Sequence, residues 1–126
     1  MNKGVKIESA VNVNQILGAL TRYHAVGVIV AAAAGVTENG KKVVKGGTPL
    51  AGDLLDRTKA FTAAAGADTV GILLHDVDVT DGDAGDGALL VGGVVNVNRL
   101  DTTTAAKITT EVVTALKGKV EFIKNN

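Results

Sequence analysis

Residues 69–98 constrain the fold most, because they have the pattern of two β-strands joined by an acidic, glycine-rich connection. In residues 69–79 the apolar side chains change phase near His75 and Asp76. Strand side chains alternate with period two, so this change predicts a bulge or bend. Residues 89–98 begin with apolar side chains on both faces. We therefore expect that strand to be covered on two sides, by its own fold or by a neighbouring subunit.

Turn chemistry and apolar runs predict the neighbouring elements. Residues 80–87 have the composition of an exposed connection and not of a strand. The pair Asn39-Gly40 can supply both left-handed residues of a type I′ turn, which predicts a hairpin. Residues 25–32 are expected to form a buried strand, and residues 46–52 a tight corner in which Pro49 fixes φ.

The C-terminal part predicts one helix and a closing strand. Between Thr103 and Lys117 apolar residues recur at helical spacing, with N-cap oxygens beginning at Asp101 and a C′ glycine at Gly118. Residues 120–123 are expected to form a short strand. The expected apolar face of the helix consists of Ala105, Ile108, Val112 and Leu116.

Two segments have weaker patterns. Residues 53–66 show no regular period, and we expect a surface excursion that Leu55 and Phe61 pin to the core. Residues 15–24 are expected to form a turn of helix that leads into a strand, although Gly18 weakens the helix.

Residues 1–14 alternate apolar and polar side chains with period two. This pattern is compatible with an edge strand of the domain's own sheet or with a disordered terminus. A third interpretation is an extended arm that adds itself to another protein's sheet, where main-chain hydrogen bonds supply the affinity. In that case the contact residues are Val5, Ile7, Val11 and Val13.

The chain of 126 residues is long enough for one domain, which we place at residues 15–126 behind the arm of residues 1–14. The expected class is mainly β (α+β). We predict a small barrel- or sandwich-like domain with one C-terminal helix and an extended N-terminal arm.

Composition excludes several functions. Basic and acidic residues balance at 13 each and aromatic residues make up only 2%, which argues against direct nucleic-acid binding by charge or by ring stacking. The absence of cysteine excludes disulfides, thiolate catalysis and the usual structural zinc sites. The most apolar run, residues 25–36, is too short to cross a bilayer, so no membrane association is expected.

Groups able to carry chemistry are few. Ser9 is far in sequence from His24 and His75, so a serine triad has little support, and both histidines are expected to be structural. The five aspartates of residues 76–86 do not have the spacing of a calcium loop, which favours a solvated turn over a metal site. We therefore predict no catalytic, cofactor or metal site, and no enzyme activity.

Four segments together resemble a known family. They are Gly47 to Leu54, Ala60 to Thr62, Ala67 to Val79, and Leu89 to Asn96. Their sequences and order resemble the lambda-type head decoration (cement) proteins of tailed bacteriophages. The resemblance extends over about residues 25–100.

The resemblance implies a virion protein that forms a homotrimer on the outer surface of the phage head and stabilises the expanded shell against the pressure of packaged DNA. It implies the major capsid protein as partner, with the N-terminal arm pairing to an extended capsid segment and no cofactor. The helix of residues 103–117 and the strand after it depart from that pattern. Two alternatives stay open. One is another virion subunit from the tail or the head-completion machinery, and the other is a small trimeric β-barrel enzyme or ligand-binding module that uses Asp76 to Asp86 with a divalent ion.

Overall fold

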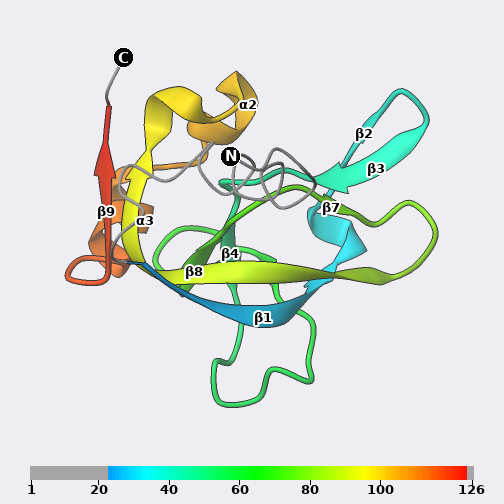
Figure 1. Cartoon of the computed structure of the whole chain (residues 1–126), viewed down its shortest axis with the longest axis horizontal. Coiled ribbons are helices and arrows are strands. Elements are labelled where there is room, and N and C mark those ends of the chain that lie inside the picture. Colours follow the sequence, from blue (N-terminus) through cyan, green and yellow to red (C-terminus); the bar gives the residue numbers. More distant parts are fainter. Residues whose placement is uncertain (1–22, 125–126) are drawn as a thin grey trace, which may run out of the picture.

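The computed structural model describes residues 23–124, which form a mostly β domain built from two sheets (Figure 1). The β-rich class predicted from the sequence is confirmed. The predicted arm, residues 1–14, lies outside the described residues, as does most of the segment 15–24.

The larger sheet has the strand order β1–β8–β6–β4–β5, and β9 joins β8 as a parallel neighbour. The other pairings in this sheet are antiparallel. Its strands are β1 (His24–Ala31), β4 (Pro49–Ala51), β5 (Thr62–Ala63), β6 (Gly71–Leu73), β8 (Ala84–Asn96) and β9 (Val120–Ile123). β1 lies at an edge, and its predicted burial holds only for Val28 and Val30.

Strand β8 separates two hydrophobic cores. Leu89 packs in a cluster with Phe61 and Leu50, and its neighbour Leu90 packs in a second cluster with Leu116. Successive strand residues point to opposite faces, which explains why adjacent leucines serve different cores. Both leucines are fully buried, so the predicted two-sided cover is supplied within one chain.

The smaller sheet contains the predicted hairpin. Asn39 and Gly40 both have positive φ, at 52° and 79°, which confirms the left-handed turn. The three strands run in the order β2–β3–β7. They are β2 (Val36–Glu38), β3 (Lys41–Val44) and β7 (Val77–Asp78), and the 3₁₀ turn η1 (Ala32–Ala34) connects β1 to β2.

The predicted bend near His75 is confirmed, but it divides residues 69–79 between the two sheets. Strand β6 pairs with β8, and the Leu74 amide still donates to the Ala88 carbonyl at 2.9 Å. The chain then turns away, and β7 pairs with β3. The Asp76 carboxylate accepts a hydrogen bond from the Gly46 amide at 2.7 Å, which holds this turn. The expected single long strand is therefore wrong.

The acidic connection is shorter than predicted, because β8 already begins at Ala84 and pairs there with Ala31 of β1. A Cβ atom at Gly85 would lie 2.8 Å from the Val77 side chain, and one at Gly87 would lie 2.9 Å from it. These glycines allow β7 to approach β8 closely, so they mark a crossing point of strands and not a loop.

The predicted single helix is two short helices, α2 (Thr102–Ala105) and α3 (Thr110–Ala115). Thr109 starts the second one, since it adopts an extended conformation and its hydroxyl accepts from the Val112 amide at 3.4 Å. A threonine hydroxyl competes for backbone groups in this way, and the β-branched residues nearby weaken a continuous helix. The predicted apolar face is retained: Ala105, Ile108, Val112 and Leu116 all contribute to the same core cluster.

Some of the remaining sequence predictions are confirmed and others are wrong. Phe61 is fully buried as predicted, whereas Leu55 is 97% exposed and pins nothing. Pro49 begins β4 and does not lie within a corner, a position where a strand tolerates its missing amide donor. Strand β9 is present as predicted, and it follows a turn in which Gly118 has a φ of 84°. The 3₁₀ turn η2 (Val97–Arg99) follows β8 earlier in the chain.

Candidate interaction surfaces

The predicted contact residues of the arm, Val5, Ile7, Val11 and Val13, lie outside the described residues, and so does Ser9. The described chain begins at Tyr23, which lies against Gly93 where β8 pairs with the start of β9. Tyr23 and the start of β1 therefore lie beside β8, which pairs with both β1 and β9.

The two histidines lie on different parts of the surface. His24 begins β1 and lies against Gly92, whereas His75 lies at the break between β6 and β7 against Gly46. The Nδ1 atom of His75 lies 3.2 Å from the Asp76 carbonyl oxygen. The two histidines have different neighbours, so they do not form one site for acid–base chemistry.

His75 lines a cleft of about 170 Å³ together with several other polar side chains. Asp76 belongs to it, but its carboxylate is engaged by the Gly46 amide. Arg99 and Asp101 also line the cleft, and the Asp101 carboxylate caps α2 by accepting from the Thr103 amide. The polar groups here thus stabilise turns and a helix start.

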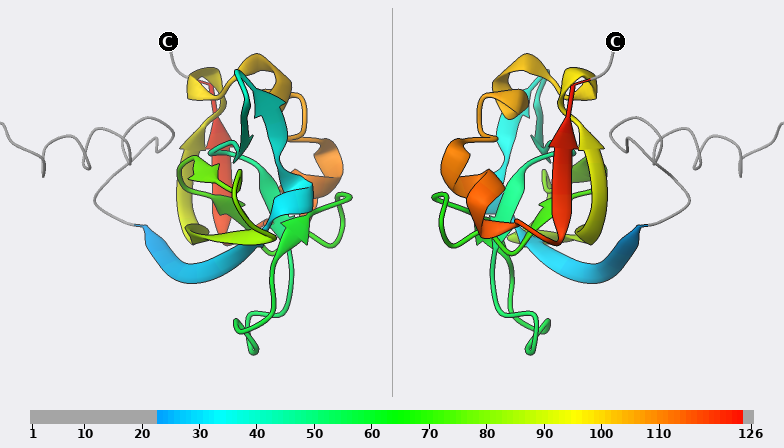
Figure 2. Two further views of the ribbon diagram at one scale, coloured as in Figure 1. Left: turned by 90° about the vertical axis from the view of Figure 1, so that its right-hand side faces the viewer. Right: turned by 90° about the vertical axis from the view of Figure 1, so that its left-hand side faces the viewer.

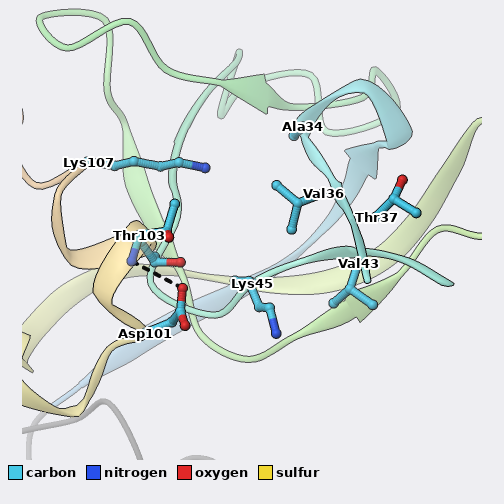
Figure 3. Close-up of a pocket in the computed structure, with 9 residues that line it drawn as sticks. Ala34, Val36, Thr37, Val43, Lys45, Asp101, Thr103 and Lys107 are labelled. Atoms are coloured by element: carbon cyan, nitrogen blue, oxygen red, sulfur yellow. Dashed lines mark hydrogen bonds between the residues drawn. The ribbon is translucent and has the colours of Figure 1, made fainter. Parts of the chain in front are cut away.

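A second cleft, of about 200 Å³, lies between the β2–β3 hairpin and α2 (Figure 3). Val36 and Val43 form its apolar side on the hairpin, and Lys107 extends across it from beyond α2 (Figure 3). Asp101 is the carboxylate of this cleft as well, and it is committed to capping. An apolar wall with a polar rim is the general make-up of protein–protein interfaces, although lysine is not enriched in them.

One carboxylate at the start of the acidic turn, that of Asp78, stabilises the turn by accepting hydrogen bonds. The side chain and the backbone of Thr80 donate hydrogen bonds to Asp78, and these lower the pKa of its carboxyl below 3.8. Within residues 23–124, no group of three or more Asp, Glu or His side chains has an arrangement that could hold a metal ion. Asp81, Asp83 and Asp86 are exposed.

The lowered pKa of Asp78 predicts a pH effect on stability. A carboxyl with a depressed folded-state pKa adds stability above 3.8, and this stability is lost as the pH falls through the folded-state pKa. We expect Asp78→Ala to unfold at lower urea concentration than wild type at pH 7, and the difference to shrink below pH 3.8. Asp81→Ala in the same turn is the control, and an Asp78→Ala difference that grows in acid would contradict the assignment.

The most exposed large apolar side chain in the described part of the chain is Leu55, in the segment between β4 and β5. This segment projects from the body of the domain, at the bottom of both views in Figure 2. The surface location of this segment was predicted from the sequence, but the expected burial of Leu55 was wrong, because apolarity alone does not tell burial. Neighbouring Asp53, Asp56 and Arg57 were the available signal, since charged residues on both sides favour a solvated loop.

Within residues 23–124, no helix has the length and apolar character required to cross a membrane. The chain matches no protein-family model, and no curated protein sequence matches it. The structure is that of a small β-rich domain with two hydrophobic cores and a projecting loop. In its surface clefts, Asp76 and Asp101 accept hydrogen bonds that stabilise a turn and a helix start.

Proposed function

We propose that this chain is a head decoration protein of a tailed bacteriophage, which binds the outer surface of the expanded capsid as a trimer. The observation that carries the proposal is the location of the four segments that resemble the lambda-type family. They contribute β4, the start of β5, β6 and the buried part of β8, which are consecutive neighbours in the larger sheet, and also β7 of the smaller sheet. The resemblance therefore falls mainly on neighbouring strands of the larger sheet.

The proposed role is structural and not enzymatic. The partner is the major capsid protein, contacted through the arm residues Val5, Ile7, Val11 and Val13, and the location is the outside of the virion. A trimer presents three arms, so each contact can be weak while the whole binds firmly through effective concentration. Strand addition by the arm requires only an extended capsid segment with free main-chain groups.

Deleting residues 1–13 is expected to remove most binding to expanded heads. The arm would supply the main-chain hydrogen bonds of the contact, whereas the two core clusters of the described domain are built from residues within 23–124. The measurement is cosedimentation of the purified protein with empty expanded heads, with circular dichroism to show that the truncated domain is folded.

A matched pair of full-length variants tests whether binding depends on the apolar side chains of the arm and not only on its presence. One replaces Val5, Ile7, Val11 and Val13 by asparagine, and the other replaces the intervening polar residues Lys6, Glu8, Asn12 and Asn14 by serine. We expect the first to lose binding and the second to retain most of it. Equal binding by the truncated and complete proteins would refute the role of the arm and leave the decoration role to the folded domain.

A further inference from the structure

The turn between β2 and β3 contains the one asparagine of the chain that is followed by glycine. Asn39 and Gly40 are both exposed, and both have positive φ. A Cβ atom built at Gly40 would find no neighbour within 4 Å, so the space around this residue is open. Because glycine has no side chain of its own, nothing on Gly40 shields its amide nitrogen from the side-chain carbon Cγ of Asn39.

The two other asparagines in residues 23–124 have different surroundings. Asn96 is buried, and its side chain accepts a hydrogen bond from the Asn98 amide at 3.1 Å. The β-branched Val97 follows it and crowds the next amide nitrogen. Asn98 is exposed, but it precedes Arg99 and not a glycine. These two residues therefore serve as internal comparisons for Asn39.

The hairpin has little apolar burial to hold its turn closed. β2 lies at the edge of the smaller sheet, and its pairing with β3 is three residues long. Val36 is 38% exposed, and Thr37 and Lys41 are exposed as well. Segments with few buried apolar contacts open locally at a small cost in free energy. Such opening frees the ψ angle of Asn39, which must rotate before the next amide nitrogen reaches Cγ.

We propose that Asn39 is a site of spontaneous deamidation in the folded protein. The Gly40 amide nitrogen attacks Cγ of Asn39, the new N–Cγ bond closes a succinimide ring, and the Cγ–Nδ2 bond breaks. The proton of the Gly40 amide is passed through solvent to the leaving nitrogen, which departs as ammonia. The reaction needs no cofactor, because both reacting groups belong to the same turn.

Water then opens the ring at either of its carbonyl carbons and gives two products. Hydrolysis at Cγ gives an ordinary aspartate. Hydrolysis at the main-chain carbonyl gives isoaspartate, in which the chain continues through Cγ. Overall, water is consumed and ammonia is released, with no change in oxidation state. Each product places a carboxylate where the hairpin had a neutral amide, so the modification changes the charge of this surface.

The two products differ in their effect on the hairpin. Asp-Gly favours a type I′ turn as Asn-Gly does, so aspartate in place of Asn39 keeps the pairing of Glu38 with Lys41. Isoaspartate adds an atom to the main chain inside this turn, and turn geometry fixes the register of a hairpin. Val36 and Val43 of the hairpin line the cleft beside α2, so the isoaspartate product alters this cleft as well.

Incubation of the full-length protein at mildly alkaline pH tests the reaction, with ammonia measured and each site followed by peptide mapping. We expect Asn39 to lose its amide before Asn96 and Asn98. The rate should rise with pH, because the attacking nitrogen must lose its proton. Asn39→Gly is the matched control, since Gly-Gly also favours the type I′ turn, and it should release ammonia only at the slower rate of the remaining asparagines. Isomerisation at Asp81-Gly82 releases no ammonia, so this readout separates the two reactions.

Thermal unfolding of the separated products tests the effect on the fold. The isoaspartate form should melt about 4–8 °C below wild type, the shift for a modest loss of stability in a domain of this size. Asn39→Asp, which reproduces the other product, should melt close to wild type. An isoaspartate form as stable as Asn39→Asp would contradict the predicted loss of hairpin register.

Two results would overturn the assignment of the site itself. One is an Asn39 that stays intact in the folded protein over the time in which the chain unfolded in urea converts, because the turn would then protect it. The other is conversion of Asn96 or Asn98 as fast as that of Asn39, because the exposed Asn-Gly turn would then have no particular role.

Discussion

Gly71→Ala is expected to destabilise the domain by about 3 kcal/mol, the upper part of the range for overpacked cores. A methyl group at this position of β6 would lie 2.7 Å from the Leu89 side chain and 2.7 Å from the Leu90 carbonyl oxygen. The second contact is with backbone of the neighbouring strand, which cannot move without disturbing the pairing of β6 with β8. Because β8 separates the two cores, any shift there is felt by both.

Gly27→Ala in β1 is the matched control for this substitution. It is also a strand glycine, but an added methyl group would have no neighbour within 4 Å. We expect unchanged stability or a gain of about 0.4–1 kcal/mol from the reduced entropy of the unfolded chain. Urea denaturation measures both variants, and equal stability of the two would mean that β6 and β8 are not packed as described.

Phe61→Ala is expected to cost about 3–5 kcal/mol, as large-to-small changes of a buried phenylalanine do. Its ring is fully buried in the cluster that contains Leu89, and it packs so closely on Gly52 that a Cβ atom there would lie 2.5 Å from the ring. Its backbone also joins β1, since the Phe61 amide donates to the Ile29 carbonyl at 2.7 Å. The loss of the ring leaves a cavity that this bonded backbone cannot easily close.

Val36→Ala provides the comparison, because Val36 is 38% exposed in the β2–β3 hairpin. Its cost should stay below about 1 kcal/mol, as for most substitutions at exposed sites. Thermal and urea unfolding of both variants checks the difference. A Phe61→Ala protein as stable as Val36→Ala would contradict the placement of Phe61 in the core.

Local signals predicted the parts of the fold that depend on few residues. Asn39-Gly40 encodes its turn because both positions require positive φ, and Gly118, also with positive φ, lies in the turn between α3 and β9. The phase change near His75 was visible because it alters which face is apolar. In each case the physical cause lies within about ten residues of sequence.

Features that depend on distant neighbours, or on a local hydrogen bond that the sequence only permits, were missed. Gly85 looks like a loop residue until Val77 is seen to pack against it. Thr109 divides the expected helix through a local hydrogen bond that its sequence allows but does not require. Leu55 is apolar, and only the folding of the loop around Asp53 and Arg57 places it in solvent.

Binding to phage heads tests the proposed decoration role most directly. The full-length protein is mixed with empty expanded heads and, separately, with unexpanded precursor heads, and the pelleted protein is measured after sedimentation. The decoration role predicts saturable binding to expanded heads in multiples of three copies and none to precursor heads. Absence of binding to expanded heads would contradict it.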